Sequence, residues 1–488
     1  MMQFTEIPKF SPLNPISLQK STNMMNRIRP WPGFPTSKPT TLSSSNNHLG
    51  DANCMEQLLV HCAQAIENND ATPAQQILWV LNNIAPPDGD TNQRLTCAFL
   101  RALILRAART PACKFILNSA TNTVTATATA TATTATATAI TNTNIVACGL
   151  NHIIHKFSLL DLANFVHLTP WHRFGFTAAN SVILEAIEGR TGVHIVDLSV
   201  TRCMQIPTLI DSIATRYQGR QPPTVRLTVG AFTQQVVPPM FDYVSYDELG
   251  NKLINFAHSK GVVLEFKAIP TTPLDGFASV LNEVRTRQQQ MRFLYANQEG
   301  EEEAEEEALV INCQMMAHYL NHEEANDEPS SGIVVSTRTM FFKAVRSLDP
   351  IMVVVVEEDV DFTSSHLVER LRSAFNYFWI PFDTVDTFLP RGSKQREWYE
   401  AEICWKIENV MSHEGEQRVE RQEPRARWTQ RMMEAEFRPV GFVAEAMAEV
   451  KTMLEEHATG WGSKKEEEDL VLTWKGHNVV FATALVPT

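Results

Sequence analysis

Residues 193–207 read Val-His-Ile-Val-Asp-Leu-Ser-Val-Thr-Arg-Cys-Met-Gln-Ile-Pro. A mostly apolar strand ends in the acid Asp197, and a short turn and the start of a helix follow it. In a doubly wound α/β sheet, this arrangement opens the crevice that binds a cofactor. The stretch therefore predicts the first strand of such a sheet.

The loop that follows this strand contains no glycine, since Thr201, Arg202, Cys203 and Met204 occupy it. A cofactor normally approaches the backbone at glycine, because a Cβ blocks close contact and disfavours positive φ. We therefore expect the fold of an enzyme without the backbone contacts that usually bind its cofactor. We also expect a loop in which no residue has a positive φ.

Apolar segments separated by helical stretches extend the strand pattern along the chain and favour a parallel sheet. They are Val193 to Leu198, Val225 to Val229, Val262 to Ile269, Leu309 to Cys313 and Met352 to Glu357. Two further segments, 470–474 and 479–484, flank the turn Lys475-Gly-His-Asn478, which is typical of an antiparallel hairpin. The pattern predicts a doubly wound, seven-stranded, mostly parallel sheet with a C-terminal antiparallel hairpin, similar to class I methyltransferases.

The N-terminal part has a different pattern. Residues 1–50 are rich in Pro, Ser, Thr and Asn and predict a disordered tail. Apolar residues at helical spacing predict three helices within 53–117, the second beginning at Thr72-Pro73. We interpret them as a helical cap rather than a coiled coil, because no heptad persists. Thr and Ala alternate through much of 118–150, which predicts a low-complexity insertion.

Composition limits the class of protein. The 488 residues are 44% hydrophobic and carry a formal charge of −13, which argues against a globally basic nucleic-acid or membrane-surface protein. The longest strongly apolar run, Ile351 to Val356, is too short to span a bilayer. Eight cysteines without a Cys-x-x-Cys pair predict reduced thiols in a cytosolic or nuclear protein.

The candidate catalytic and binding residues do not form a constellation. The second strand runs into Gly230-Ala-Phe232 without the acid that usually holds a cofactor ribose. We expect Asp197 to cap the next helix or to bond loop amides, and His194 to be a hydrogen-bonded core or interface residue. Four histidines (His152, His155, His167 and His172) lack partners at metal-ligand spacing. The sequence thus predicts no catalytic residue, no cofactor and no metal.

Two charged stretches stand out near the middle and the end of the chain. The glutamate-rich run 299–307 favours a solvated loop over an acidic activation segment. A later cluster contains Arg418, Arg421, Arg425, Arg427 and Arg431. Acidic residues alternate with these arginines, which predicts an ion-paired helix face or interface rather than a track for phosphates.

Five separated motifs, in order, resemble the GRAS family of plant regulatory proteins and its Scarecrow-like branch over residues 53–488. The resemblance divides this region into leucine-rich region I (53–117), a VHIID-like region (155–231), leucine-rich region II (241–273), a PFYRE-like region (283–408) and a SAW-like region (411–488). Residues that match its motifs, and that we expect to have structural or interaction roles, are His194, Asp197, Gln205, Pro207, Arg418, Glu420, Arg421, Trp428 and Trp474.

The resemblance implies a noncatalytic nuclear transcription regulator with a helical cap on a degenerate methyltransferase-like core. It implies protein partners, including a homo- or heterodimer through residues 53–117, and DNA as a further partner of some members. Two other hypotheses remain open. One is a methyltransferase that binds S-adenosylmethionine through an unusual loop. The other is a receptor that binds a small molecule in the crevice where such a cofactor would lie.

Overall fold

The computed structural model describes residues 52–110, 113, 155–232, 238–241, 245–296, 307–320 and 336–488. The predicted disordered tail, the Thr/Ala insertion and residues 299–306 of the glutamate run lie outside these ranges. All described residues belong to one compact unit.

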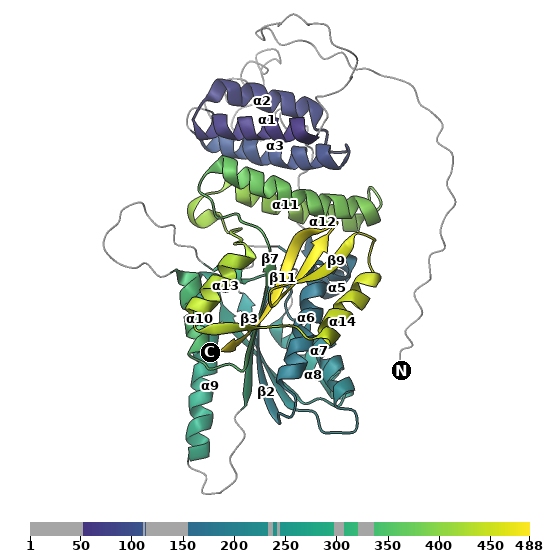
Figure 1. The fold of residues 1–488 in the computed structure, drawn as a ribbon, viewed down its shortest axis with the longest axis vertical. Coiled ribbons are helices and arrows are strands. Elements are labelled where there is room, and N and C mark those ends of the chain that lie inside the picture. The colour runs from purple at the N-terminus through teal and green to yellow at the C-terminus, as the bar shows by residue number, and fades with distance from the viewer. Residues whose placement is uncertain are drawn as a thin grey trace, which may run out of the picture. The chain divides into compact units, whose positions relative to one another are not determined.

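The described residues form a nine-stranded sheet at the centre of this unit (Figure 1). Its parallel part consists, in spatial order, of β5 (Leu264–Thr271), β3 (Thr224–Phe232), β2 (Gly192–Ser199), β6 (Ala308–Gln314) and β7 (Met352–Glu358). The antiparallel part continues through β11 (His477–Pro487), β10 (Asp469–Trp474) and β9 (Trp461–Glu466), and β8 (Phe437–Val440) also pairs with β11. A separate two-stranded sheet joins β1 (Lys156–Phe157) to β4 (Met240–Phe241). The predicted α/β class, with its parallel sheet and terminal hairpin, is confirmed.

The strand count is nine rather than the predicted seven, because β8 and β9 lack a strand-like apolar pattern. β8 contains Pro439, and β9 reads Trp-Gly-Ser-Lys-Lys-Glu. Proline and charged residues suit strands at the edge of a sheet, where unpaired backbone groups face solvent. The hairpin turn is also shorter than predicted, since only Lys475 and Gly476, both at positive φ, separate β10 from β11.

Helices cover both faces of the sheet (Figure 1). One face carries α6 (Pro170–Ala186), α7 (Ile206–Arg216), α8 (Tyr246–Ser259) and α14 (Ala444–Glu455). The other carries α9 (Ala278–Ala296), α10 (Thr337–Arg346) and α13 (Arg425–Glu434). α5 (Leu159–Leu168) precedes α6, and Thr169 between them caps α6 by accepting a hydrogen bond from the Trp171 amide.

The cap consists of α1 (Ala52–Glu67), α2 (Ala71–Ile84) and α3 (Thr91–Arg109), and it packs against α11 (Leu367–Phe388) and α12 (Lys394–Ser412) (Figure 1). Asp90 begins α3 with a capping box that includes Gln93. α2 begins before the predicted Thr72, because Asp70 occupies the N-cap position and Pro73 falls within the first turn.

The cap and the rest of the protein share one hydrophobic core. Phe99 of α3 lies 5.5 Å from Phe375 of α11, centroid to centroid. Arg94 of α3 also forms ion pairs with Asp386, at 2.9 Å, and with Glu400, at 3.3 Å. Removal of the cap would therefore expose apolar surface of α11 and α12 to water.

Two expectations from composition can be compared with the described residues. Six cysteines are free thiols, but Cys97 is disulfide-bonded, so the prediction of reduced cysteines throughout is wrong at that position. None of the helices in the described ranges combines the length and apolar character of a bilayer-spanning segment.

Candidate functional site

The loop after β2 lies at the carboxyl end of the strand, where a doubly wound sheet would hold a cofactor. Arg202 and Cys203 have φ values of 47° and 64°. The expectation that this loop avoids positive φ is therefore wrong. Asp197 offsets part of the conformational free energy that these positive φ values cost, because it accepts hydrogen bonds from the Ser199 hydroxyl, at 2.8 Å, and from the Cys203 backbone. Thr201 and Cys203 are buried, so side chains fill the bend.

A network of buried amide side chains joins this loop to β6. The Gln205 side-chain oxygen accepts hydrogen bonds from Asn312, at 2.8 Å, and Gln314, at 2.5 Å, while its nitrogen donates to Asn180, at 2.9 Å. Asn312 also donates to Asp197, at 2.7 Å. The sequence analysis missed Asn312 and Gln314, although two amides at i and i+2 in an apolar strand must share one face. The network fills the polar part of the crevice with the protein's own groups.

His194 belongs to β2 but not to this crevice. Its ring bonds the Thr228 hydroxyl at 2.8 Å and lies 3.8 Å from Glu307, which immediately precedes β6. Burial, together with the positive charges of Arg226 and Arg287, lowers the pKa of His194 to about 3. His194 is thus a neutral, hydrogen-bonded core residue, as its strand position predicted, and it lies at the opposite end of β2 from Gln205.

Arg418, Glu420 and Arg421 are buried between α12 and α13. Arg418 donates to the carbonyl of Phe362, at 3.0 Å, and Arg421 donates to the carbonyl of Arg418, at 2.8 Å. Glu420 accepts a hydrogen bond from the Tyr319 hydroxyl, at 2.8 Å. The prediction of a helix face is wrong for these residues, since all three precede α13 and are buried. The two arginines donate mainly to backbone carbonyls, and Glu420 accepts from Tyr319 and Gln422.

The remaining motif residues stabilise individual elements. Pro207 lies in the first turn of α7, where the missing N–H costs no helical hydrogen bond. Trp474 is buried and donates to Asp383 at 2.7 Å. Trp428 is buried beneath the Arg338 guanidinium, which lies 5.1 Å from the ring centroid.

The histidines that were considered as metal ligands are dispersed. His155 stacks on Trp398 at 4.4 Å, and His172 is half-buried, with its pKa lowered to about 3 by desolvation and by Lys406. His152 lies outside the described residues. Within the described ranges, no group of three or more His, Cys, Asp or Glu side chains is placed to hold a metal ion.

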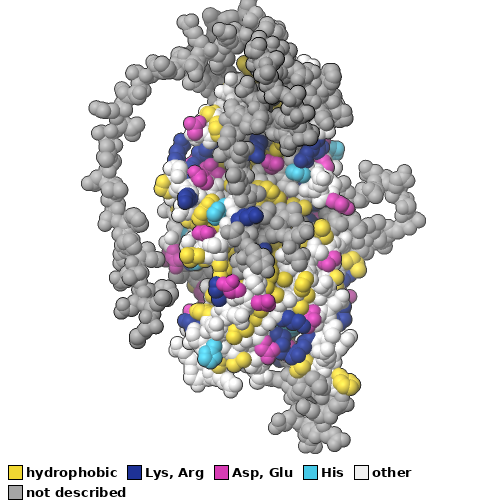
Figure 2. Space-filling model, turned by 180° about the vertical axis from the view of Figure 1, so that it is seen from behind, with side chains coloured by type: hydrophobic (Ala, Val, Ile, Leu, Met, Phe, Trp, Pro, Cys, Tyr) yellow, Lys and Arg dark blue, Asp and Glu magenta, His cyan; other side chains and the backbone are white. Residues whose placement is uncertain are grey.

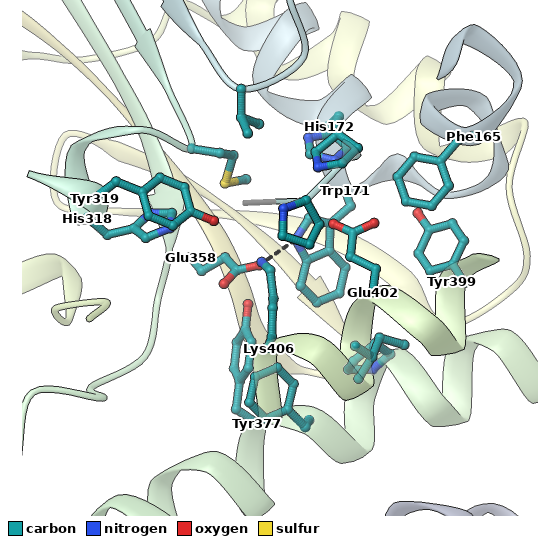
Figure 3. A pocket seen from close by; sticks show the side chains of 17 residues that line it. Phe165, Trp171, His172, His318, Tyr319, Glu358, Tyr377, Tyr399, Glu402 and Lys406 are labelled. Carbon is teal, nitrogen blue, oxygen red and sulfur yellow. Dashed lines mark hydrogen bonds and ion pairs between the residues drawn. The ribbon is translucent and has the colours of Figure 1, made fainter. Parts of the chain in front are cut away.

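A second group of buried charges lies at the carboxyl end of β7. Glu358, Glu402 and Lys406 project into one small cavity of about 50 Å³ (Figure 3). Glu358 accepts hydrogen bonds from Lys406, at 2.8 Å, and from the Trp171 indole, at 3.1 Å. Glu402 Oε2 has neither accessible surface nor a hydrogen-bond partner. A cavity of this size and polarity suits ordered water rather than a cofactor.

The charged groups in this cavity shift one another's pKa values. The pKa of Glu402 is raised to about 7, mainly by burial and also by Glu358 and Glu420, against the opposing effect of Lys406. For Lys406, burial favours the neutral form, but Glu358, Glu420 and Glu402 together outweigh that effect and raise its pKa. The cavity therefore gains negative charge as the pH passes through neutrality.

We expect Glu402→Gln to make stability less dependent on pH. Because the folded pKa, about 7, lies above the ordinary value of 4.5, Glu402 favours the folded state at low pH, and this contribution is lost as the pH rises through 7. The free energy of unfolding of the variant, relative to the unmodified protein, should rise by about 2 kcal/mol between pH 5 and pH 8. Chemical denaturation at several pH values measures it.

Glu397→Gln is the matched control, since it removes an exposed carboxylate from the same helix, α12. Its stability should follow the unmodified protein across the pH range. If the free energy of unfolding of Glu402→Gln varied with pH in the same way as that of the control and the unmodified protein, the raised pKa of Glu402 would be contradicted.

The order of the strands and the helical cap define a methyltransferase-like α/β fold in which buried side chains occupy the loop after β2. The chain belongs to the GRAS domain family, whose model matches residues 55–485. This confirms the resemblance found in the sequence, and the protein is a member of a plant family of transcription regulators.

Two relatives and one solved structure place the chain within the family. It is 50% identical to Scarecrow-like protein 32 of Arabidopsis thaliana over 469 residues, covering 96% of this chain and 99% of that protein. It is 28% identical to protein SHORT-ROOT of Arabidopsis thaliana, covering 93% of this chain and 76% of that protein. The crystal structure of SCL7 of Oryza sativa shares the fold, with a TM-score of 0.63 at 21% identity, covering 88% of this chain and 99% of that chain.

Proposed function

We propose that the protein is a noncatalytic transcription regulator that acts in the nucleus. It binds other transcription regulators, or a second copy of itself, through the cap, residues 53–117. Membership of a plant regulatory family supports the general role. The filled crevice supports the noncatalytic part, because Asp197 and Gln205 already bond to groups of the protein.

The outer surface of the cap offers an anchor for a partner. Trp79 of α2 is 42% exposed, although a side chain of this size usually lies inside a protein. Large aromatic residues of this kind often dominate the energy of protein interfaces. The inner surface of the cap packs against α11 and α12, so the proposal places the partner on the outer surface.

Trp79→Ala should weaken partner binding by at least about tenfold, because truncation of an interface tryptophan commonly costs about 2 kcal/mol or more. Light scattering across protein concentrations measures self-association, and capture from plant nuclear extract measures binding of other regulators. Deletion of residues 53–117 is a poorer test, since it would also expose the shared core.

Phe293→Ala is the control, because it shortens an aromatic side chain that is 70% exposed on α9, away from the cap. Its association should equal that of the unmodified protein. Unchanged association of Trp79→Ala, with loss in Phe293→Ala, would reject the cap as the docking surface. Micromolar binding of S-adenosylmethionine in calorimetry would reject the noncatalytic assignment.

The proposal includes DNA as a further partner. Arg418 and Arg421 are buried, so they do not support a phosphate track, whereas Arg427 is exposed on α13. On the face drawn in Figure 2, basic side chains form separate groups beside acidic ones. Contacts to DNA would therefore be local and few.

A further inference from the structure

The parallel sheet has a topological switch point between β2 and β6. From β2 the chain moves to β3 and β5 on one side, and then returns to β6 and β7 on the other. Because the connections leave in opposite directions, a crevice opens at the carboxyl ends of the strands at such a point, and ligands of α/β proteins bind there.

A cavity of about 550 Å³ lies at this edge of the sheet. Its floor includes Val200, Phe232 and Met316, which end or follow β2, β3 and β6. Leu274, in the 3₁₀ turn after β5, and Trp405, on α12, form walls. The volume lies within the range of about 300–1,000 Å³ that is typical of small-molecule sites. The amide network around Gln205 thus fills only part of the crevice.

The cavity is adjacent to the charged one in Figure 3, and the two share Val200 and Tyr319. They differ in size, and the larger cavity has mostly apolar walls. The polar groups of Tyr319 and Asn409 in its wall already have partners in Glu420 and in the backbone.

The charge of the wall selects among ligands. Its lining within the described residues includes two carboxylates, Glu408 and Glu416, and no lysine or arginine. His413 adds no positive charge at neutral pH, because burial and Arg109 lower its pKa. Glu408 lies 3.5 Å from Arg101 of α3, whereas Glu416 is exposed at the rim.

We propose that this cavity binds a small amphipathic molecule with an apolar body of ring size and an uncharged or cationic hydrogen-bond donor at one end. The apolar floor removes the body from water, and the donor faces Glu408 and Glu416. Carboxylic acids and phosphates bind poorly, because an anion would meet these carboxylates. The proposal does not depend on the regulatory role.

Two dyes with the same ring skeleton test the site in the full chain. N-phenyl-1-naphthylamine is uncharged, whereas 8-anilinonaphthalene-1-sulfonate carries an added sulfonate. Fluorescence titration should show saturable binding of the uncharged dye and at least about tenfold weaker binding of the sulfonate. Glu416→Gln should reduce the difference in affinity between the two dyes. Absence of saturable binding of the uncharged dye, or tighter binding of the sulfonate, would overturn the proposal.

Two variants that narrow the cavity locate the dye. Leu274→Trp changes a side chain that is 64% exposed at the rim, so the fold should tolerate it, and Val419→Trp enlarges a half-buried wall residue. Each should weaken binding of the uncharged dye at least about tenfold. Leu160→Trp, at a position that is 71% exposed on α5, is the control and should leave binding unchanged. Equal binding by the unmodified protein and a folded Leu274→Trp or Val419→Trp variant would place the dye elsewhere and reject the site.

Discussion

Replacing Glu423 by glutamine should lower the free energy of unfolding by about 3–5 kcal/mol. The Glu423 carboxylate lies between two guanidinium groups. It is 3.1 Å from Arg338 and accepts hydrogen bonds from Arg431 at 2.6 and 2.7 Å. Glu423 and Arg338 are fully buried, and burial lowers the pKa of Arg338 to about 10 despite the opposing effect of Glu423. The variant would leave these positive charges in the interior without their counter-ion.

Chemical denaturation at pH 7 measures this loss. Glu434→Gln is the control, since Glu434 is exposed on α13 and bonds Gln430 at 3.0 Å. An exposed pair of this kind contributes little, so the control should change stability by less than about 0.5 kcal/mol. A loss below about 1 kcal/mol in Glu423→Gln would show that Arg338 finds sufficient compensation in carbonyl groups and in Trp428.

Gln205→Ala should lower the free energy of unfolding by about 3 kcal/mol, through lost hydrogen bonds and a new cavity. Asn180 loses its partner for the side-chain oxygen, while Asn312 and Gln314 each lose one of two acceptors. Because these groups are buried in the described part of the crevice, water reaches them only through the space that the substitution creates.

The same denaturation experiment checks this result. Gln218→Ala makes the same chemical change at an exposed position after α7 and should be nearly neutral. If Gln205→Ala were equally neutral, the amide network would not stabilise the crevice. The filled polar region, which supports a noncatalytic role, would then need another explanation.

Much of the fold could be predicted because burial leaves a local record in sequence. Four parallel strands, β2, β3, β6 and β7, are largely buried and therefore read as nearly continuous apolar runs, whereas the edge strand β5 is mostly exposed or half-buried. β9 lies at the edge of the sheet, and the short strand β8 pairs only with β11. Polar residues and Pro439 are tolerated at such positions, so neither strand has a continuous apolar sequence. Within the arginine-rich cluster, Arg425 and Arg431 form ion pairs from α13 as predicted, but Arg418 and Arg421 were misinterpreted for a related reason. Alternating charges suit a solvated helix, and only contacts with distant carbonyl groups reveal that Arg418 and Arg421 are buried.

Sequence alone determined the periodicity of the strands and helices, the glycine-free loop after β2 and the family, since these depend on residues that are near one another or on ordered motifs. Tertiary structure alone decided which polar groups meet. Gln205 finds Asn312 and Gln314 on another strand, Glu423 meets Arg338 from α10, and a cavity remains beside Val200. The physical reason is that a local pattern records whether a side chain is buried, whereas its partner depends on how distant segments pack together.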